Sequence, residues 1–268
     1  MNNHLKQLSA GAVFILAYVP TFIWMWDRWF ARDSYYSHGI LIPFITVFLI
    51  WQKREELALI KKVRSAWGLP LIIIGMLTHA FASLMRVYFI SGFSMLIVLI
   101  GLILFFYGFA VFRKILFPVL FLAFMLPVPL VLITNISFKM KIFAAKIATT
   151  VLNNSGIPCI REGSVIRMRH AQVVVDDVCS GLRSLISLMA LGSIFAYWMR
   201  STMAKRCVLF LTAVPIAVIT NVLRVIFLSS VAEIWGVRYA SGFIHDLSGF
   251  LVFALAFVLL YAMGRVLE

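Results

Sequence analysis

The chain alternates long apolar runs with short polar segments. A helix needs about 20 predominantly apolar residues to cross a hydrocarbon layer about 30 Å thick, and this spacing predicts about eight transmembrane helices. Their approximate spans are 9–26, 39–52, 67–85, 88–112, 115–134, 182–199, 207–231 and 247–264. The second run is short and contains Pro43, so we expect it to be tilted, kinked or partly re-entrant. The fold class predicted is an all-α integral membrane protein.

The segment 135–178 does not follow the transmembrane pattern. Residues 135–152 mix apolar positions with three lysines, as in an amphipathic helix that lies in the membrane interface. The turn signal at 153–156 comes next, and the alternation and β-branched residues of 157–178 then predict two or three short strands, with a turn near Glu162-Gly163. Open strand edges cannot face lipid, so this β-like ribbon is expected outside the membrane or covered by protein. The sequence shows no repeat, so residues 1–268 are predicted to form a single multi-pass membrane domain.

Composition excludes other classes of protein. Hydrophobic residues make up 63% of the chain and charged residues only 13%, whereas a soluble domain has roughly 45–50% and about 25%, and a disordered chain has low hydrophobicity. The net charge of +14 would suit a nucleic-acid partner only if the basic residues shared one solvated face. They cluster instead between the apolar runs, so we expect no nucleic-acid partner and a lipid bilayer around the protein.

The basic residues also predict the orientation. If the N-terminus is cytoplasmic, the inside segments hold twelve Lys and Arg residues, and the short outside loops hold four. The positive-inside rule therefore places both termini in the cytoplasm and the β-like ribbon on the periplasmic or exterior face. We expect the chain in the inner (plasma) membrane.

Cys179 is the first candidate catalytic residue. It lies where the β-like stretch gives way to Ser180 and the apolar helix that follows. The positive end of a helix dipole favours a thiolate, the nucleophilic form of cysteine, and Arg183 would add positive charge. Asp176 and Asp177 would oppose it if they point inward. The alternative is that Cys179 is a small buried hydrophobic residue.

The other two cysteines have weaker signals. Cys159 is predicted on the same side as Cys179, so a disulfide between them is conceivable in an oxidising compartment, and it would block a nucleophilic role. Cys207 lies in an apolar run near the cytoplasmic side, where we expect it in the core.

Arg224 lies inside the seventh apolar run, about two turns from its predicted outer end. A guanidinium at that depth costs at least ~2.5 kcal/mol, so a function or a partner is the default expectation. Asn221 is three residues earlier and shares its helix face. The alternative is that the Arg224 side chain extends to the outer interface.

His245 lies just before the last helix, again at the predicted outer face. Its imidazole can change protonation near neutral pH, as a general acid or base must. Asp246 is adjacent, but neighbouring helix positions do not face each other, so it need not orient the ring. His38 is a second outer-face histidine and competes for this role.

Cys179, Arg224 and His245 have complementary chemistry and are all predicted near the outer leaflet. A thiolate can attack a peptide carbonyl, an imidazole can transfer the proton, and a guanidinium can stabilise the developing oxyanion. Water would then complete a proteolysis, and an amine would complete a transpeptidation. A serine or metal intramembrane protease is a weaker alternative, because His-Glu-x-x-His is absent from the sequence, as is Gly-x-Ser-x-Gly in an apolar helix. We expect no metal and no cofactor.

These residues lie in motifs that resemble the exosortase/archaeosortase family, and the resemblance covers nearly the whole chain. Five motifs occur in the family's order. They are Tyr35-Tyr36-Ser37-His38-Gly39, Leu126-Pro127-Val128-Pro129, Asp177-Val178-Cys179-Ser180-Gly181-Leu182-Arg183-Ser184-Leu185, Asn221-Val222-Leu223-Arg224-Val225 and His245-Asp246-Leu247-Ser248-Gly249.

The resemblance implies a membrane-embedded cysteine transpeptidase or protease for PEP-CTERM-like sorting signals. It carries the nucleophile to Cys179, the oxyanion-stabilising arginine to Arg224 and the acid/base histidine to His245. The implied partners are membrane-anchored proteins whose C-terminus has a short motif, a transmembrane helix and a basic tail. Some family members have a further domain associated with exopolysaccharide systems. The alternative function is a transporter or exopolysaccharide export component without peptidase activity, with Arg224 on the path of an anionic substrate.

Overall fold

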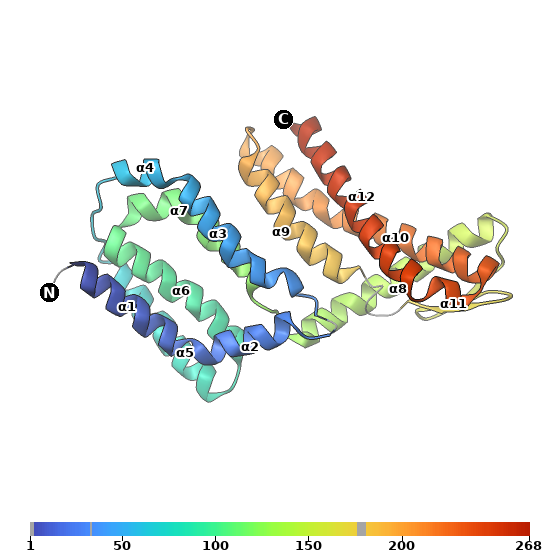
Figure 1. Cartoon of the computed structure of the whole chain (residues 1–268), viewed down its shortest axis with the longest axis horizontal. Helices are drawn as coiled ribbons and strands as arrows, with labels where there is room; N and C mark the ends of the chain where they lie inside the picture. Colours follow the sequence, from blue (N-terminus) through green and yellow to red (C-terminus); the bar gives the residue numbers. More distant parts are fainter. Residues whose placement is uncertain (1–2, 33, 176–180) are drawn as a thin grey trace. The chain divides into compact units, whose positions relative to one another are not determined.

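The computed structural model describes residues 3–32, 34–175 and 181–268, and most of these residues are helical (Figure 1). The chain divides into two compact units, Met1–Pro129 and Leu130–Glu268. The first contains α1 (Asn3–Ala17), α2 (Val19–Trp29), the 3-10 helix η1 (Ser37–Ile40), α3 (Leu41–Gln52), α4 (Arg54–Leu59), α5 (Gly68–Leu84), α6 (Tyr88–Tyr107), α7 (Phe109–Phe121) and the 3-10 helix η2 (Leu122–Met125). The second contains α8 (Leu130–Asn154), β1 (Ile160–Glu162), β2 (Val165–Arg167), β3 (Gln172–Val174), α9 (Leu182–Trp198), α10 (Met203–Trp235), α11 (Val237–Ala240) and α12 (Phe243–Leu267). A single multi-pass domain stays a prediction.

Each of the eight predicted spans contains helix, but eight crossings are not confirmed. In the described part of the chain, three helices are long and apolar enough to cross a membrane alone, namely α6, α10 and α12. Two bent pairs, α1 with α2 and α7–η2 with α8, raise the number to five if each pair is one span. The apolar helices Ser37–Gln52, Gly68–Leu84 and Leu182–Trp198 have 17 residues or fewer. The structure thus supports an α-helical membrane protein with three to five clear spans.

The continuous helix expected over 115–134 is wrong. Helix α7 ends at Phe121, η2 follows, and α8 begins only at Leu130. Pro127 and Pro129 explain the break, because proline lacks an N–H donor and forces the residue before it into an extended conformation. The first predicted span is also bent, by 57° between α1 and α2, with Pro20 in the first turn of α2.

Helices α5 and α6 of the first unit pack closely through glycines. A Cβ placed on Gly101 would lie 2.9 Å from the carbonyl oxygen of Gly68, and a Cβ on Gly75 would lie 2.5 Å from Cγ2 of Val98. Small residues let helix backbones approach in an apolar environment, where dispersion contacts must replace the hydrophobic effect.

A buried network of neutral polar groups links three helices of this unit. The Ser91 hydroxyl lies 2.6 Å from Thr21 Oγ1 and 2.8 Å from His79 Nδ1, and Tyr18 OH lies 2.9 Å from Ser94 Oγ. All five side chains are buried. Each group satisfies another, which offsets the cost of placing a polar atom among apolar helices.

The second unit combines a helical core with a small sheet. The core of α9, α10 and α12 includes Leu188, Ala213 and Leu260, all without exposed surface. The predicted ribbon is confirmed as a three-stranded antiparallel sheet in the order β1-β2-β3, with Ile166 opposite Arg161 and Val173.

The sheet and helix α8 pack on the C-terminal half of α10. Ala148 of α8, Ile166 and Val175 share one buried cluster with Val222 and Val225 of α10. The sheet therefore shares a buried cluster with the part of α10 that carries the candidate residue Arg224. The side of the membrane on which the sheet lies, and an interfacial position for α8, stay predictions.

Candidate active site

Arg224 and His245 are in contact. Arg224 lies on α10, about three turns before the helix ends at Trp235, which is one turn farther from the helix end than predicted. Its Nη2 lies 3.2 Å from His245 Nε2 and donates to the His245 carbonyl oxygen at 3.0 Å. Its Nε donates to Ser248 Oγ at 3.2 Å. The side chain is half-buried and bonded within the protein, which argues against the alternative of an arginine extended to the interface.

The contact defines the tautomer of His245. A guanidinium has only donors, so Nε2 accepts the hydrogen bond and carries no proton in the neutral ring. The proton then lies on Nδ1, which is 3.1 Å from Oδ1 of Asp246. This assignment follows from the hydrogen-bond network. Asp246 thus contacts the ring even though adjacent helix positions diverge, because both residues lie in the first turn of α12.

Ser248 and Gly249 complete the surroundings of Arg224, and neither was singled out from the sequence. Ser248 is buried, and its hydroxyl donates to the His245 carbonyl at 2.7 Å while its oxygen accepts from Arg224. A Cβ on Gly249 would lie 3.2 Å from Nη2 of Arg224, so glycine gives the guanidinium room. Helical spacing was an available signal, because positions three and four beyond His245 share its face of α12.

Asn221 connects this cluster to the start of α9. It is 3% exposed and lies one turn before Arg224 on α10. Gly181 has a φ of 75°, and a Cβ added to it would lie 2.6 Å from Cγ of Asn221. Only glycine allows both this backbone conformation and this approach. Gly181, two positions after Cys179 in the sequence, is therefore the point at which the chain contacts Asn221 of α10.

The prediction for Cys179 itself lies outside the described residues, as do Asp176, Asp177 and Ser180. Arg183 is half-buried in the first turn of α9, two positions after Gly181. His38 lies in the first unit, on η1, where its ring is 6.0 Å from that of Tyr36. A supporting role for Arg183 or His38 stays a prediction.

One of the other two cysteines, Cys207, differs from its prediction. Cys159 is a buried free thiol whose Sγ lies 3.6 Å from the Thr149 carbonyl oxygen. Burial, and secondarily the negative charge of Glu233, raise the pKa of this thiol, which disfavours the reactive thiolate. Cys207 is exposed, so its expected place in the core is wrong: it lies near the start of α10, on a face that the other helices of its unit leave uncovered. Among the described residues, no group of three or more His, Cys, Asp or Glu side chains could hold a metal ion.

Comparisons with known proteins agree with the motifs. The model of one protein family, the transmembrane exosortase, matches residues 7–262 of the 268-residue chain. Among curated proteins there is no match, and among solved structures there is none either.

Proposed function

Because the chain belongs to the transmembrane exosortase family, we propose that it is a membrane-embedded cysteine transpeptidase or protease that processes C-terminal sorting signals of exported proteins. The observation that carries the proposal is the contact between Arg224 and His245 at 3.2 Å. It joins the two residues that the motifs assign to oxyanion stabilisation and proton transfer, although 20 residues separate them in the chain.

The proposed reaction begins at Cys179. Its thiol proton passes to His245 Nε2, which gives up its hydrogen bond from Arg224 Nη2 as it accepts the proton, and the thiolate attacks the carbonyl carbon of the scissile peptide. The carbonyl oxygen becomes an oxyanion beside Arg224. Collapse of this intermediate breaks the C–N bond, the imidazolium returns the proton to the leaving amine, and a thioester to Cys179 remains.

The second half of the reaction resolves the thioester. Water or an acceptor amine attacks the acyl carbon, loses a proton to His245, and releases the thiol of Cys179. Arg224 has five N–H donors, and its bonds among the described residues engage only Nε and Nη2. Donors therefore remain for the oxyanion in both halves.

The surroundings support an arrangement held in advance of the substrate. Ser248 and the His245 carbonyl fix the guanidinium, Asp246 holds the Nδ1 proton, and Gly181 brings the chain to Asn221. A preorganised donor costs no reorganisation during the reaction. The His245 side chain is 25% exposed, which gives a substrate access. The substrate itself is proposed to be a membrane-anchored protein that presents its cleavage site at the outer face.

The test is co-expression with a reporter that ends in a short motif, an apolar helix and a basic tail. Mass spectrometry of the reporter's new C-terminus distinguishes the two reactions. A free carboxylate means hydrolysis, and an amide-linked adduct means transfer. We expect Cys179→Ala, Arg224→Ala and His245→Ala to be present in the membrane but to leave the reporter intact.

The matched control is Cys207→Ala, which removes an exposed thiol from the same unit and should process the reporter at the normal rate. Normal processing by Cys179→Ala would refute the cysteine mechanism. It would favour the alternative of a transporter or exopolysaccharide export component.

A further inference from the structure

The first unit contains a cavity of about 480 Å³ between α3, α4, α6 and α7, remote in sequence from every residue of the candidate active site. Its floor is apolar and includes Ile103, Val111 and Ile115, which belong to the buried cluster of this region. The volume falls within the range of about 300–1,000 Å³ that is typical of sites for small molecules.

Two cations line the same cavity. Arg54 lies with its Cζ 4.3 Å from the ring centroid of Trp51, and Lys62 lies with its Nζ 5.6 Å from the ring centroid of Tyr107. Contact with the face of an aromatic ring holds a cation without neutralising it. Arg54 also meets Glu55 at 3.3 Å, but both side chains are more than half exposed, and such a pair is weak in water.

The cavity lies where apolar helices end. Helix α6 stops at Tyr107 and α3 stops at Gln52, and the segments 53–64 and 113–114 that follow hold seven basic and two acidic residues. One of the acidic residues, Glu56, is paired with Lys114 at 2.8 Å. The ends of apolar spans lie at the depth of the lipid head groups, so a positively charged rim surrounds an apolar cavity at that depth.

We propose that this cavity binds an anionic phospholipid. The phosphate lies between Arg54 and Lys62, and one acyl chain lies against Ile103, Val111 and Ile115. Basic pockets between membrane helices are suited to anionic head groups because Lys and Arg near the membrane surface attract them. The basic rim thus attracts the charged head group, and the apolar floor contacts the acyl chain.

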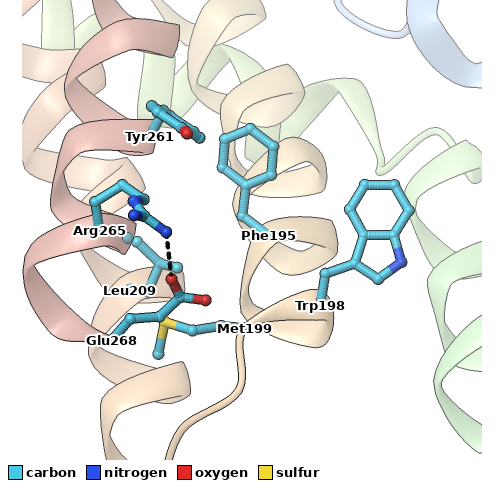
Figure 2. Close-up of a pocket in the computed structure, with 8 residues that line it drawn as sticks. Phe195, Trp198, Met199, Leu209, Tyr261, Arg265 and Glu268 are labelled. Carbon is cyan, nitrogen blue, oxygen red and sulfur yellow. Dashed lines mark hydrogen bonds and ion pairs between the residues drawn. The ribbon is translucent and has the colours of Figure 1, made fainter.

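A second cavity, of about 240 Å³ between α9, α10 and α12, provides a comparison (Figure 2). Its cation, Arg265, is paired with Glu268 at 3.0 Å beside Phe195 and Tyr261. An acidic residue thus lines this cavity beside its cation, whereas none is among the described residues that line the first cavity, so an anionic head group is disfavoured there.

The experiment uses the full-length protein, stripped of lipid in neutral detergent, with phosphatidylglycerol as the probe and phosphatidylcholine as the uncharged reference. Native mass spectrometry counts the lipids that stay bound. We expect the double variant Arg54→Gln/Lys62→Gln to bind phosphatidylglycerol about 25-fold more weakly, because each basic residue contributes about 1 kcal/mol to such attraction. Phosphatidylcholine should bind equally to both proteins.

Three further variants separate this site from general attraction by the basic rim. Lys61→Gln/Arg113→Gln removes two charges from exposed positions that do not line the cavity and should retain the lipid. Ala58→Trp keeps every charge but fills the cavity and should lose it. Arg265→Gln, at the second cavity, should bind as the wild type does.

The proposal is overturned if Arg54→Gln/Lys62→Gln retains phosphatidylglycerol, or if both double variants lose it equally. It is also overturned if millimolar inorganic phosphate displaces the lipid completely, because the ligand would then be a free anion. These outcomes are independent of the reporter assay, so failure of either proposal is recognisable by itself.

Discussion

Polar side chains gather among apolar helices in both units, but the two clusters differ in charge and in access. In the first unit Ser91 joins Thr21 and His79 in a buried set of neutral partners. In the second unit Arg224 brings a permanent charge to His245, a quarter of whose side chain is exposed. The first arrangement is closed and suits stability. The second has a charge, a lone pair and an opening, which are the requirements of a reactive site.

The largest expected effect is in the second unit. Replacement of Arg224 by Gln removes the charge and most donors, so turnover of the reporter should fall about 100- to 1,000-fold, the usual cost of one oxyanion donor. The amount of folded protein in the membrane should change little. Rates normalised to folded protein test this.

Arg224→Lys is the matched variant, because it keeps the charge but lacks the planar fork that reaches Ser248 and His245 together. Full activity of Arg224→Gln would mean that the Arg224 cluster has only a structural role, as the Ser91 cluster of the first unit does.

Gly181→Ala should have the next largest effect. Its φ of 75° costs a non-glycine residue roughly 1–2 kcal/mol, and its Cβ would also meet Cγ of Asn221 at 2.6 Å. We expect lower thermal stability together with a loss of turnover. Gly156→Ala is the control, because Gly156 has a φ of 84° but nothing within 4 Å of an added Cβ. Equal losses in the two variants would mean that the contact with Asn221 contributes nothing.

Ser91→Ala tests the neutral cluster of the first unit. It removes the partner of both Thr21 and His79, and bonds between membrane helices contribute about 0.6 kcal/mol on average and up to ~1.7. Thermal unfolding in detergent should therefore show a loss of about 1–2 kcal/mol, while turnover per folded molecule stays normal. Ser9→Ala, at an exposed position of the same unit, should show neither change. A large fall in turnover with intact stability would contradict a structural role.

The smallest effect is expected at the surface pair of Glu56 and Lys114. The hydrogen bond and the charge of Lys114 lower the pKa of Glu56 below its ordinary value of 4.5. A depressed pKa stabilises the fold above the unfolded-state value, and this contribution disappears as the pH falls through the folded-state value. The melting temperature of Glu56→Gln should therefore lie slightly below that of the wild type at pH 7 and match it near pH 3. Glu55→Gln, which leaves the pair intact, is the control. A difference that persists at pH 3 would exclude the ion pair as its cause.

The sequence predicted the helices and the ribbon because hydrophobic periodicity is a local signal. It failed between 115 and 134, where apolar character continued through Pro127 and Pro129 and concealed the break between Met125 and Leu130. Composition alone could not show this break, because the helix ends where proline removes backbone N–H donors and not where polar residues occur. The number of crossings was uncertain for the same reason, since α5 and α9 are apolar but short.

The candidate site was predictable as a set of residue types but not as a geometry. A costly arginine and a titratable histidine were visible in the sequence, but their contact depends on how α12 packs against α10. Ser248 had no distinguishing chemistry, because serine is common in apolar helices and only its two bonds at the cluster reveal its role. Cys207 was misplaced because an apolar neighbourhood predicts burial in a soluble core, whereas a membrane helix exposes apolar faces to lipid.

The length of α10 has a consequence for the membrane itself. Its 33 residues span about 50 Å, whereas the hydrocarbon layer is about 30 Å thick. We therefore expect the helix to tilt, or to extend beyond the hydrocarbon layer by about 20 Å. Glu233 near its C-terminal end accepts a hydrogen bond from the backbone N–H of His170 at 3.0 Å, which ties the loop beside β3 to that end. If that end extends from the bilayer, a thicker membrane would bring the sheet closer to the head groups and place Arg224 deeper below the surface.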